Sequence, residues 1–175
     1  MPDRIGQSFS TRFVLRYRKT IMRRNIMLEV KTISVEDTYE IRHRILRPHQ
    51  SIEQCKYKED HAEGSFHLGV FYDGTLISIA SFSPQSQPLL TEASAYRLRG
   101  MATLEGYRDQ KAGSTLIKHA EHKLAESGVQ AVWCNARHHV KGYYAKLGWK
   151  ELGEPFDIPG IGNHIVMYKT LRTSR

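Results

Sequence analysis

The stretch YRDQKAGSTLI at positions 107–117 joins two segments of different character. The segment before it, 96–103, is predicted to form a strand, and the segment after it is predicted to form a helix that ends at Gly128. A loop of small and basic residues between a strand and a helix N-terminus presents free backbone N–H groups and the positive end of the helix dipole, which together bind phosphate. We therefore expect a pyrophosphate-binding loop, with an ordinary strand-to-helix turn as the alternative.

The helix after this loop is amphipathic. Its apolar residues recur at helical spacing on one side, and charged residues occupy the other side, a pattern typical of a helix that lies on a sheet. The apolar set is Leu116, Ile117, Ala120 and Leu124. Residues 129–136 are then predicted to form a strand, and residues 140–149 a short helix that ends at Gly148. Two further strands, 149–152 and 163–171, are expected to flank a loop at 155–162.

The first half of the chain contains a strand, a helix and a hairpin. An alternating strand begins at Met27, and Ser34 with Asp37 resembles a capping box for a helix that ends near Leu46. The polar segment 47–64 is expected to contain one short helix. Asp73-Gly74, flanked by strands 66–72 and 75–83, is a strong hairpin signal.

This order of elements predicts the fold class. The order of strands and helices indicates a three-layer α/β fold with a mixed central sheet. A chain of 175 residues with 40% hydrophobic content forms one domain with a substantial core. We place that domain at 27–175.

The net charge of +8 is concentrated at the N-terminus. Residues 1–26 hold seven Lys or Arg against Asp3, so the remainder of the chain is nearly neutral. The basic character therefore does not indicate a nucleic-acid-binding face. We interpret 1–26 as an extension upstream of the natural start, dispensable for folding. An organelle-targeting peptide or a membrane-surface helix is the alternative.

Other features narrow the class of protein. No apolar run approaches the roughly 20 residues that span a bilayer, so we expect no membrane association. Cys55 and Cys134 lack metal-ligand spacing and do not form a disulfide framework. We expect a cytoplasmic protein without a metal, whose oligomeric state the sequence leaves open, a homodimer included.

The C-terminal half resembles the GNAT family of N-acetyltransferases. That family has a cofactor loop of the form Gln/Arg-x-x-Gly-x-Gly/Ala and a later helix with a Phe-Tyr-x-x-x-Gly-Phe signature. Arg108 and Gly113 match the ends of the loop pattern, and YYAKLGW at 143–149 matches the helix. Lys111 stands where the middle Gly is expected, and a Lys favours ordinary backbone angles there. The resemblance extends from Met27 to Leu171, and it implies a three-layer α/β/α fold whose mixed central sheet is mostly antiparallel.

The resemblance implies a site for acetyl-CoA and an amine acceptor. Pyrophosphate would bind the loop amides, and the pantetheine arm would pair with the strand edge at Met101, Ala102 and Thr103. Tyr144 aligns with the family's general-acid tyrosine, with Tyr143 expected to point inward. Asn135 is a candidate for the pantetheine arm, although the usual Asn position, seven residues before the tyrosine, is Arg137. The loop residues concerned are Arg108, Asp109, Gln110, Lys111, Ala112, Gly113 and Ser114.

The acceptor side is less defined by the sequence. Arg97 and Arg99 lie on one face of the predicted strand, and we expect them to be either structural ion pairs with loop carboxylates or part of an acceptor site for an anionic substrate. The strand lacks the Glu that many family members use as a general base. The remaining base candidates are Glu92, Glu105, Glu154, Asp157, His164 and His67.

The preferred function is acetyl transfer from acetyl-CoA to a primary amine, on a small molecule or a peptide. An acyl-CoA-binding regulatory domain without transfer is one alternative, supported by Lys111 and the missing Glu. A nucleic-acid-associated protein that uses the basic N-terminus is another, and its binding would weaken steeply with salt.

Overall fold

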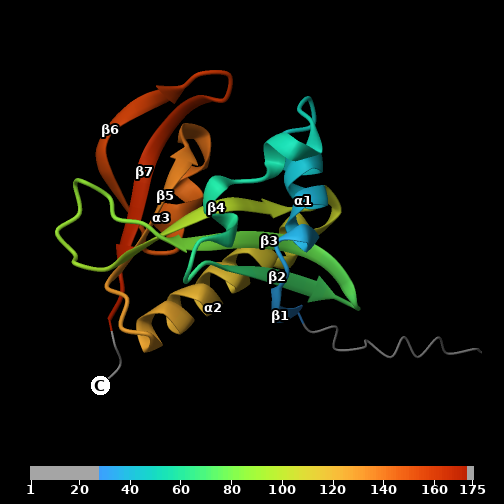
Figure 1. The fold of residues 1–175 in the computed structure, drawn as a ribbon, viewed down its shortest axis with the longest axis horizontal. Coiled ribbons are helices and arrows are strands. Elements are labelled where there is room, and N and C mark those ends of the chain that lie inside the picture. The colour runs from blue at the N-terminus through green and yellow to red at the C-terminus, as the bar shows by residue number, and fades with distance from the viewer. Residues whose placement is uncertain (1–27, 173–175) are drawn as a thin grey trace, which may run out of the picture.

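The computed structural model describes residues 28–172 (Figure 1). The expectations for residues 1–26 lie outside this range. A seven-stranded sheet has the order β1-β2-β3-β4-β5-β7-β6. Its neighbouring strands are antiparallel except β4 and β5, which are parallel, so the predicted mixed and mostly antiparallel sheet is confirmed. The strands are β1 Leu28–Ile33, β2 Phe66–Tyr72, β3 Thr75–Pro84, β4 Ala95–Thr103, β5 Ala131–Arg137, β6 Lys150–Ile158 and β7 Gly162–Thr170.

The predicted hairpin is the β2–β3 connection. Asp73 and Gly74 both have positive φ, 48° and 78°, and they are the two residues between the strands. Positive φ at both positions is the geometry of a type I′ turn, whose twist matches that of the paired strands. The Asp73-Gly74 signal in the sequence therefore predicted both residues of the turn.

Helix α1 (Glu36–Ile41) continues directly into a π-helical turn, η1 (Arg42–Leu46). The Ser34 hydroxyl accepts from the Asp37 N–H, and an Asp37 carboxylate oxygen accepts from the Ser34 N–H, which is the predicted capping box. Residues 47–64 contain two 3₁₀ helices, η2 (Ile52–Cys55) and η3 (Lys58–His61), where the sequence predicted one helix.

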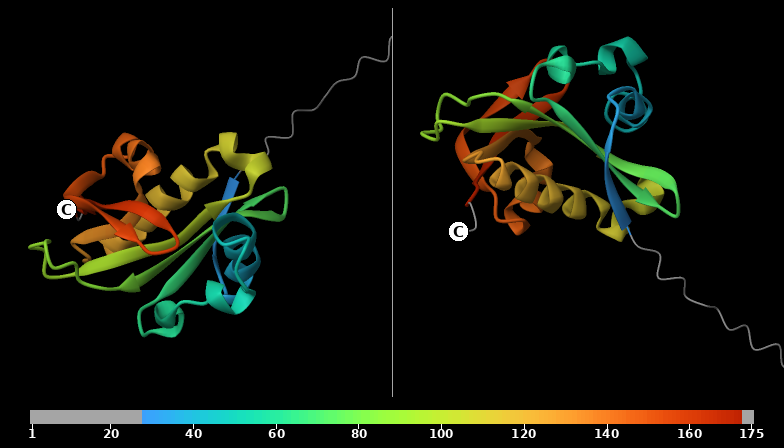
Figure 2. Two further views of the ribbon diagram at one scale, coloured as in Figure 1. Left: turned by 90° about the horizontal axis from the view of Figure 1, so that it is seen from above. Right: turned by 60° about the horizontal axis from the view of Figure 1, so that its bottom comes forward.

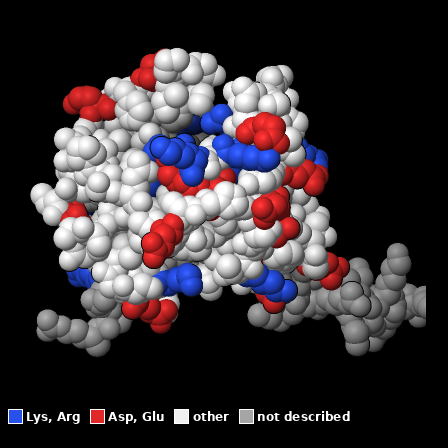
Figure 3. Space-filling view, viewed as in Figure 1, with Lys and Arg blue, Asp and Glu red and all other residues white. Residues whose placement is uncertain are grey.

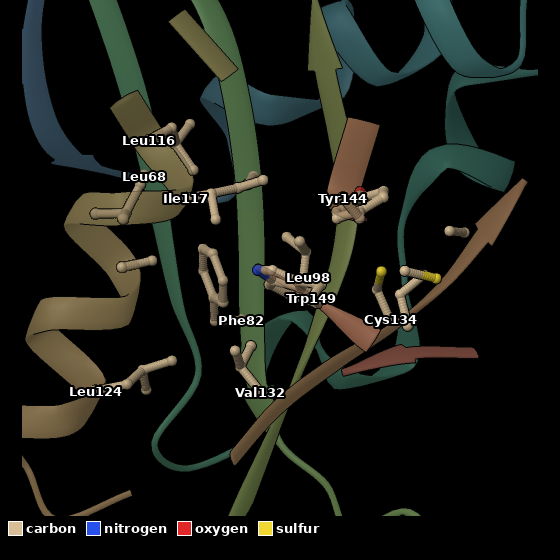
Figure 4. Packing of buried hydrophobic residues seen from close by; sticks show 14 of the residues in the cluster. Leu68, Phe82, Leu98, Leu116, Ile117, Leu124, Val132, Cys134, Tyr144 and Trp149 are labelled. Carbon is tan, nitrogen blue, oxygen red and sulfur yellow. The ribbon is translucent and has the colours of Figure 1, made fainter. Parts of the chain in front are cut away.

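Helix α2 (Ala112–Glu126) packs on one face of the sheet, and its apolar side lies in the main core (Figure 4). Leu116 and Ile117 are almost fully buried against β2, β3 and β4 residues such as Leu68, Phe82 and Leu98. Burial of a side chain of this size stabilises the fold by about 1.5–3 kcal/mol. The short 3₁₀ helix η5 (His138–Val140) and helix α3 (Lys141–Lys146) lie on the same face, because Tyr144 joins this core.

The opposite face of the sheet is covered by α1 and η1 (Figure 2). Ile41 packs there on Ile79 of β3 and Ala102 of β4. Two helical layers with a sheet between them form the expected three-layer arrangement.

One element is longer than the sequence predicted. The expected strand at 149–152 and loop at 155–162 are instead a nine-residue strand, β6, that pairs with β7 up to Ile158. Pro155 is tolerated because β6 is an edge strand whose register shifts between Leu152 and Phe156. Proline at an edge or bulge does not end a strand, which is why the loop prediction was wrong.

Candidate active site at the opening between β4 and β5

Strands β4 and β5 separate after a short paired segment. Their register partners are Ala95 with Ala131, Tyr96 with Val132, and Arg97 with Trp133. Beyond this point β4 continues to Thr103 beside β3, whereas β5 continues beside β7 (Figure 1). One edge of the β4 backbone, including 101–103, therefore faces an opening in the sheet. An extended ligand arm can pair with such an edge as an added strand would.

A bulge at Gly100 shapes this edge. Ile79 is opposite Ala102 and Ser81 is opposite Arg99, so β4 has one extra residue here. Gly100 has φ +58°, and a Cβ at this position would lie 2.8 Å from Arg42 Nε. Only glycine meets both constraints. The bulge turns Met101 towards the main core, the same side of the sheet as Leu98.

The predicted phosphate loop leads into the N-terminus of α2. A 3₁₀ helix, η4 (Glu105–Gln110), is followed by Lys111, and the Thr115 N–H donates to the Lys111 carbonyl as the first bond of α2. The amides of Ala112, Gly113 and Ser114 therefore precede the helical hydrogen bonds, and unpaired amides at a helix N-terminus are a common place for an anion to bind. Arg108, in η4, is exposed and lies 3.6 Å from Glu105.

The backbone conformation of Lys111 is not the one that the sequence predicted. The residue has φ 60° and ψ 16°, the left-handed conformation that glycine favours, although a Lys was expected to require ordinary angles. Lysine thus follows the path that the family's middle Gly would take, with its side chain exposed. The surrounding helices η4 and α2 hold the turn and outweigh the preference of a single residue.

The start of α2 adjoins the opening closely. A Cβ on Gly113 would lie 2.7 Å from Met101 Cε and 2.8 Å from the Tyr143 hydroxyl. The absence of a side chain at Gly113 therefore lets α2 approach both β4 and α3. The structure brings together the loop residues and strand residues that the sequence nominated separately.

The two tyrosines are arranged in the reverse of the expected way. Tyr144 is buried, 8% exposed, whereas Tyr143, which was expected to point inward, is 38% exposed. The Tyr144 hydroxyl lies 3.7 Å from Met101 Sδ, so it reaches across to β4. The reason is the helical register of α3, which directs Tyr144 at the core together with Trp149.

Burial controls protonation in this region. Burial, with the adjacent Cys134, raises the pKa of Tyr144 well above its ordinary value. Burial raises the pKa of Cys134 to about 12, with the Tyr144 hydrogen bond acting in the opposite direction. Both groups are therefore neutral at physiological pH. A neutral phenol is a proton donor, whereas a neutral buried thiol is a poor nucleophile.

Asn135 is on β5, on the face of the sheet opposite the main core. Its neighbours Cys134 and Ala136 face the main core, so strand alternation places Asn135 on the other face with Trp133 and Arg137. It is half-buried. Arg137 Nη2 donates to the Leu46 carbonyl at 3.3 Å and thereby connects β5 to the end of η1.

Arg97 and Arg99 also face away from α2, and the structure separates their roles. Arg99 forms an ion pair with Glu59 of η3 and stacks on Tyr57, as the structural interpretation predicted. Arg97 instead stacks on Trp133, with its Cζ 4.7 Å from the ring centroid, and Nη1 lies 3.4 Å from Gln85 Oε1. The contacts described for Arg97 include no carboxylate.

A buried ion pair between Arg42 and Asp60 was not predicted from the sequence. Arg42 donates to both carboxylate oxygens of Asp60, at 2.6 and 2.8 Å, and also to Ser81 Oγ. Burial opposes ionisation of Asp60, but hydrogen bonds from Arg42 and from the Tyr57 N–H outweigh it and lower the pKa of Asp60. The available signal was the position of Arg42 next to Ile41 on the apolar side of the helix.

The six candidates for a general base either make structural contacts or are exposed to solvent. His67 is buried between Ser81 Oγ and the Asp60 carbonyl, and burial lowers its pKa. His164 bonds the Gly162 carbonyl, as a structural histidine would. Two of the four carboxylates make contacts at the surface: Glu92 accepts a hydrogen bond from the Thr170 hydroxyl, and Glu105 pairs with Arg108. The other two, Glu154 and Asp157, are exposed on β6. None has a geometry that singles it out as a base.

One face of the molecule is hollowed. Figure 3 shows a notch between the side of the molecule that carries β6–β7 and the side that carries α1, with Lys and Arg side chains at its floor. Within residues 28–172, no group of three or more His, Cys, Asp or Glu side chains is arranged to hold a metal ion. No helix in the same range is both long and apolar enough to cross a membrane.

Comparison with known proteins agrees with this geometry. Residues 28–149 match the acetyltransferase (GNAT) family. The chain belongs to the GNAT acetyltransferase family. Membership supports acyl transfer from an acyl-CoA to an acceptor.

Solved GNAT structures share the fold at low identity. The ribosomal-protein-S18-alanine N-acetyltransferase from Escherichia coli is 18% identical, with a TM-score of 0.65 over 85% of this chain and 97% of that chain. An aminoglycoside 6′-N-acetyltransferase complexed with coenzyme A is 15% identical, with a TM-score of 0.63 over 81% and 96%. An acyl-CoA N-acyltransferase from Pseudomonas aeruginosa is 18% identical, with a TM-score of 0.61 over 82% and 99%.

Proposed function

We propose that this protein is an acetyl-CoA-dependent N-acetyltransferase that acts on a primary amine by direct transfer. The main support is the opening between β4 and β5, which has anion-directed amides at α2 and a buried, neutral phenol at Tyr144. A cytoplasmic location is part of the proposal, since both cysteines are free and buried.

The described residues fit acetyl-CoA. The unpaired β4 edge at 101–103 accommodates an extended pantetheine arm, and the N-terminus of α2 accommodates the pyrophosphate. Gly113 has no Cβ where one would collide with Met101, so the close approach of α2 to β4 depends on glycine at this position. Arg108 and Lys111 add positive charge beside the phosphates, and Asn135 remains a candidate contact for the arm.

The cosubstrate supplies an activated acyl group as a thioester. The β4 amides near Met101 would donate to the thioester oxygen as negative charge develops on it, a role that typically contributes about 10²–10³ in rate. Tyr144 would donate its hydroxyl proton to the departing thiolate. Its raised pKa keeps that proton in place across the neutral and mildly alkaline range.

Binding without transfer is less supported than it was from the sequence. Lys111 counted in its favour as a poor fit to the loop, but the residue takes the left-handed conformation that the loop requires. The missing strand Glu is the remaining support, and amines that are partly neutral at the assay pH do not depend on a dedicated base.

A panel of primary amines with acetyl-CoA, followed by release of free thiol, tests the proposal. Small amines, amino acids, an aminoglycoside and peptides with free N-termini or lysines cover the acceptor classes. At least one amine should release thiol well above the rate without acceptor, and Tyr144→Phe should lower that rate. Tight CoA binding with no release by any amine would contradict transferase activity and favour a binding domain.

A further inference from the structure

Several buried or half-buried arginines lie on the face of the sheet opposite α2, and not all of them form an ion pair with a carboxylate of residues 28–172. Arg42 is paired with Asp60 and Arg99 with Glu59. Arg97 has no carboxylate contact within residues 28–172, and its Nε is a buried nitrogen without a hydrogen-bond partner in that range.

An arginine in this condition is costly to the free protein. Burial, together with the positive charge of Arg99, lowers the pKa of Arg97, and the Glu59 carboxylate, which is paired with Arg99, offsets this only in part. Guanidinium groups nevertheless stay protonated in proteins and present a planar fork that suits carboxylate and phosphate. The cost is removed when an anion occupies the site.

The position of Arg97 relates it to the reaction. Its register partner is Trp133, at the last paired position before β4 and β5 separate, so Arg97 stands at the base of the opening. Trp133 packs with Val166 of β7 and Phe156 of β6, and the adjacent Arg99 contacts η3. Arg97 therefore lies between β6 and β7 on one side and η3 on the other. Arg137 of β5 is a second cation on the same face of the sheet, and its described hydrogen bond is to the Leu46 carbonyl.

We propose that the acceptor of this enzyme is an amine that also carries an anionic group, a carboxylate or a phosphate, and that Arg97 binds this group. The inference rests on the proposed function and specifies its substrate class. Trp133 would hold the guanidinium plane by stacking, which leaves its donor edge for the anion. Arg97 is thus a specificity-determining residue that positions the acceptor.

Matched acceptor pairs test the proposal. Glycine and β-alanine are compared with their amides, and phosphoethanolamine with ethanolamine, each corrected for the neutral fraction of the amine. At least one anionic member should exceed its neutral partner in kcat/KM. In Arg97→Gln this preference should fall by about 10–100-fold, the range for a charged hydrogen bond, while the rate with the neutral amine stays near wild type. Arg97→Lys should restore part of it.

The control is Arg44→Gln, which removes the same charge from an exposed position in η1 and should leave the preference intact. Equal use of anionic and neutral acceptors by the wild type would overturn the proposal. An equal loss for both acceptors in Arg97→Gln would also overturn it, because Arg97 would then be only structural.

Anion binding can be measured without any transfer. The chain has two tryptophans, so Trp149→Phe leaves Trp133 as the fluorescent reporter beside Arg97. Glutarate and inorganic phosphate are the probes, and at least one should change the emission with saturation that Arg97→Gln abolishes. Saturable binding with no thiol release from any amine would keep the anion site and reject the transferase. No saturable change with either probe would overturn the anion site.

Discussion

The Tyr144 hydroxyl on α3 lies 3.7 Å from the Met101 sulfur on β4, across the opening that β4 and β5 leave between them. Tyr144 is thus buried beside the strand edge proposed to hold the thioester. Tyr143, its neighbour, has its hydroxyl near the Gly113 backbone instead. The two residues differ in position but share the same chemistry, which makes each a control for the other.

Tyr144→Phe should lower the single-turnover rate of acetyl transfer by about 10²–10⁴-fold at nearly unchanged CoA affinity. The substitution removes one hydroxyl and keeps the packed ring, so it tests proton donation with little change in the fold. Tyr143→Phe should reduce the rate only slightly. A wild-type rate for Tyr144→Phe together with a slow Tyr143→Phe would mean that the roles are reversed.

Lys111 tests whether the loop needs its backbone or its charge. Lys111→Asn removes the charge and tolerates the left-handed conformation, and Lys111→Gly removes both the charge and the strain. Both should weaken CoA binding by a similar factor, about 2–5-fold, because an exposed charge contributes modestly. Calorimetry gives the affinities. Tighter binding by the Gly variant would show instead that lysine distorts the loop.

The buried Arg42–Asp60 pair should dominate the stability of the η1–η3 region. Arg42→Met leaves a buried carboxylate without its partner and should lower the free energy of unfolding by about 3–5 kcal/mol. Urea titration measures the loss. Lys56→Gln, which breaks an exposed pair with Glu53, is the control and should show no measurable loss. A small effect of Arg42→Met would mean that water or a rearranged side chain compensates Asp60.

The buried thiol predicts alkaline destabilisation. Cys134 has a folded-state pKa of about 12 against an ordinary value of 9.0, because burial disfavours the thiolate. In the unfolded chain the thiol loses its proton near pH 9, whereas the folded protein keeps it up to about pH 12. The free energy of unfolding is therefore unaffected by this group below pH 9 and falls as the pH rises towards 12. Urea unfolding between pH 8 and 11 should show a decline that is shallower in Cys134→Ala, each protein being referred to its own value at pH 8. Parallel declines would contradict the assignment.

The sequence predicted those features that depend on local pattern. The hairpin at Asp73-Gly74, the capping box of Ser34 with Asp37 and the amphipathic α2 are all set by short-range rules, and all three are present. The loop of the candidate site was nominated from its position between a strand and a helix, and the strand residues 101–103 from the resemblance to the GNAT family.

Features that depend on long-range packing were not predicted. The partner of Arg42 is 18 positions away, and nothing local identifies Asp60 as that partner. The length of β6 depends on pairing with β7, which overrides the usual effect of Pro155 on a strand. Which tyrosine faces the core depends on how α3 docks, and the left-handed Lys111 depends on the elements on either side of it.

The central claim is that the opening between β4 and β5 holds acetyl-CoA with its phosphates at the start of α2. Calorimetric titration with acetyl-CoA and with acetyl-pantetheine, which lacks the nucleotide and its phosphates, tests this most directly. The account predicts that acetyl-CoA binds at least about 10-fold more tightly, because the α2 amides, Arg108 and Lys111 contact only the phosphorylated ligand. Equal affinity for the two compounds would contradict it.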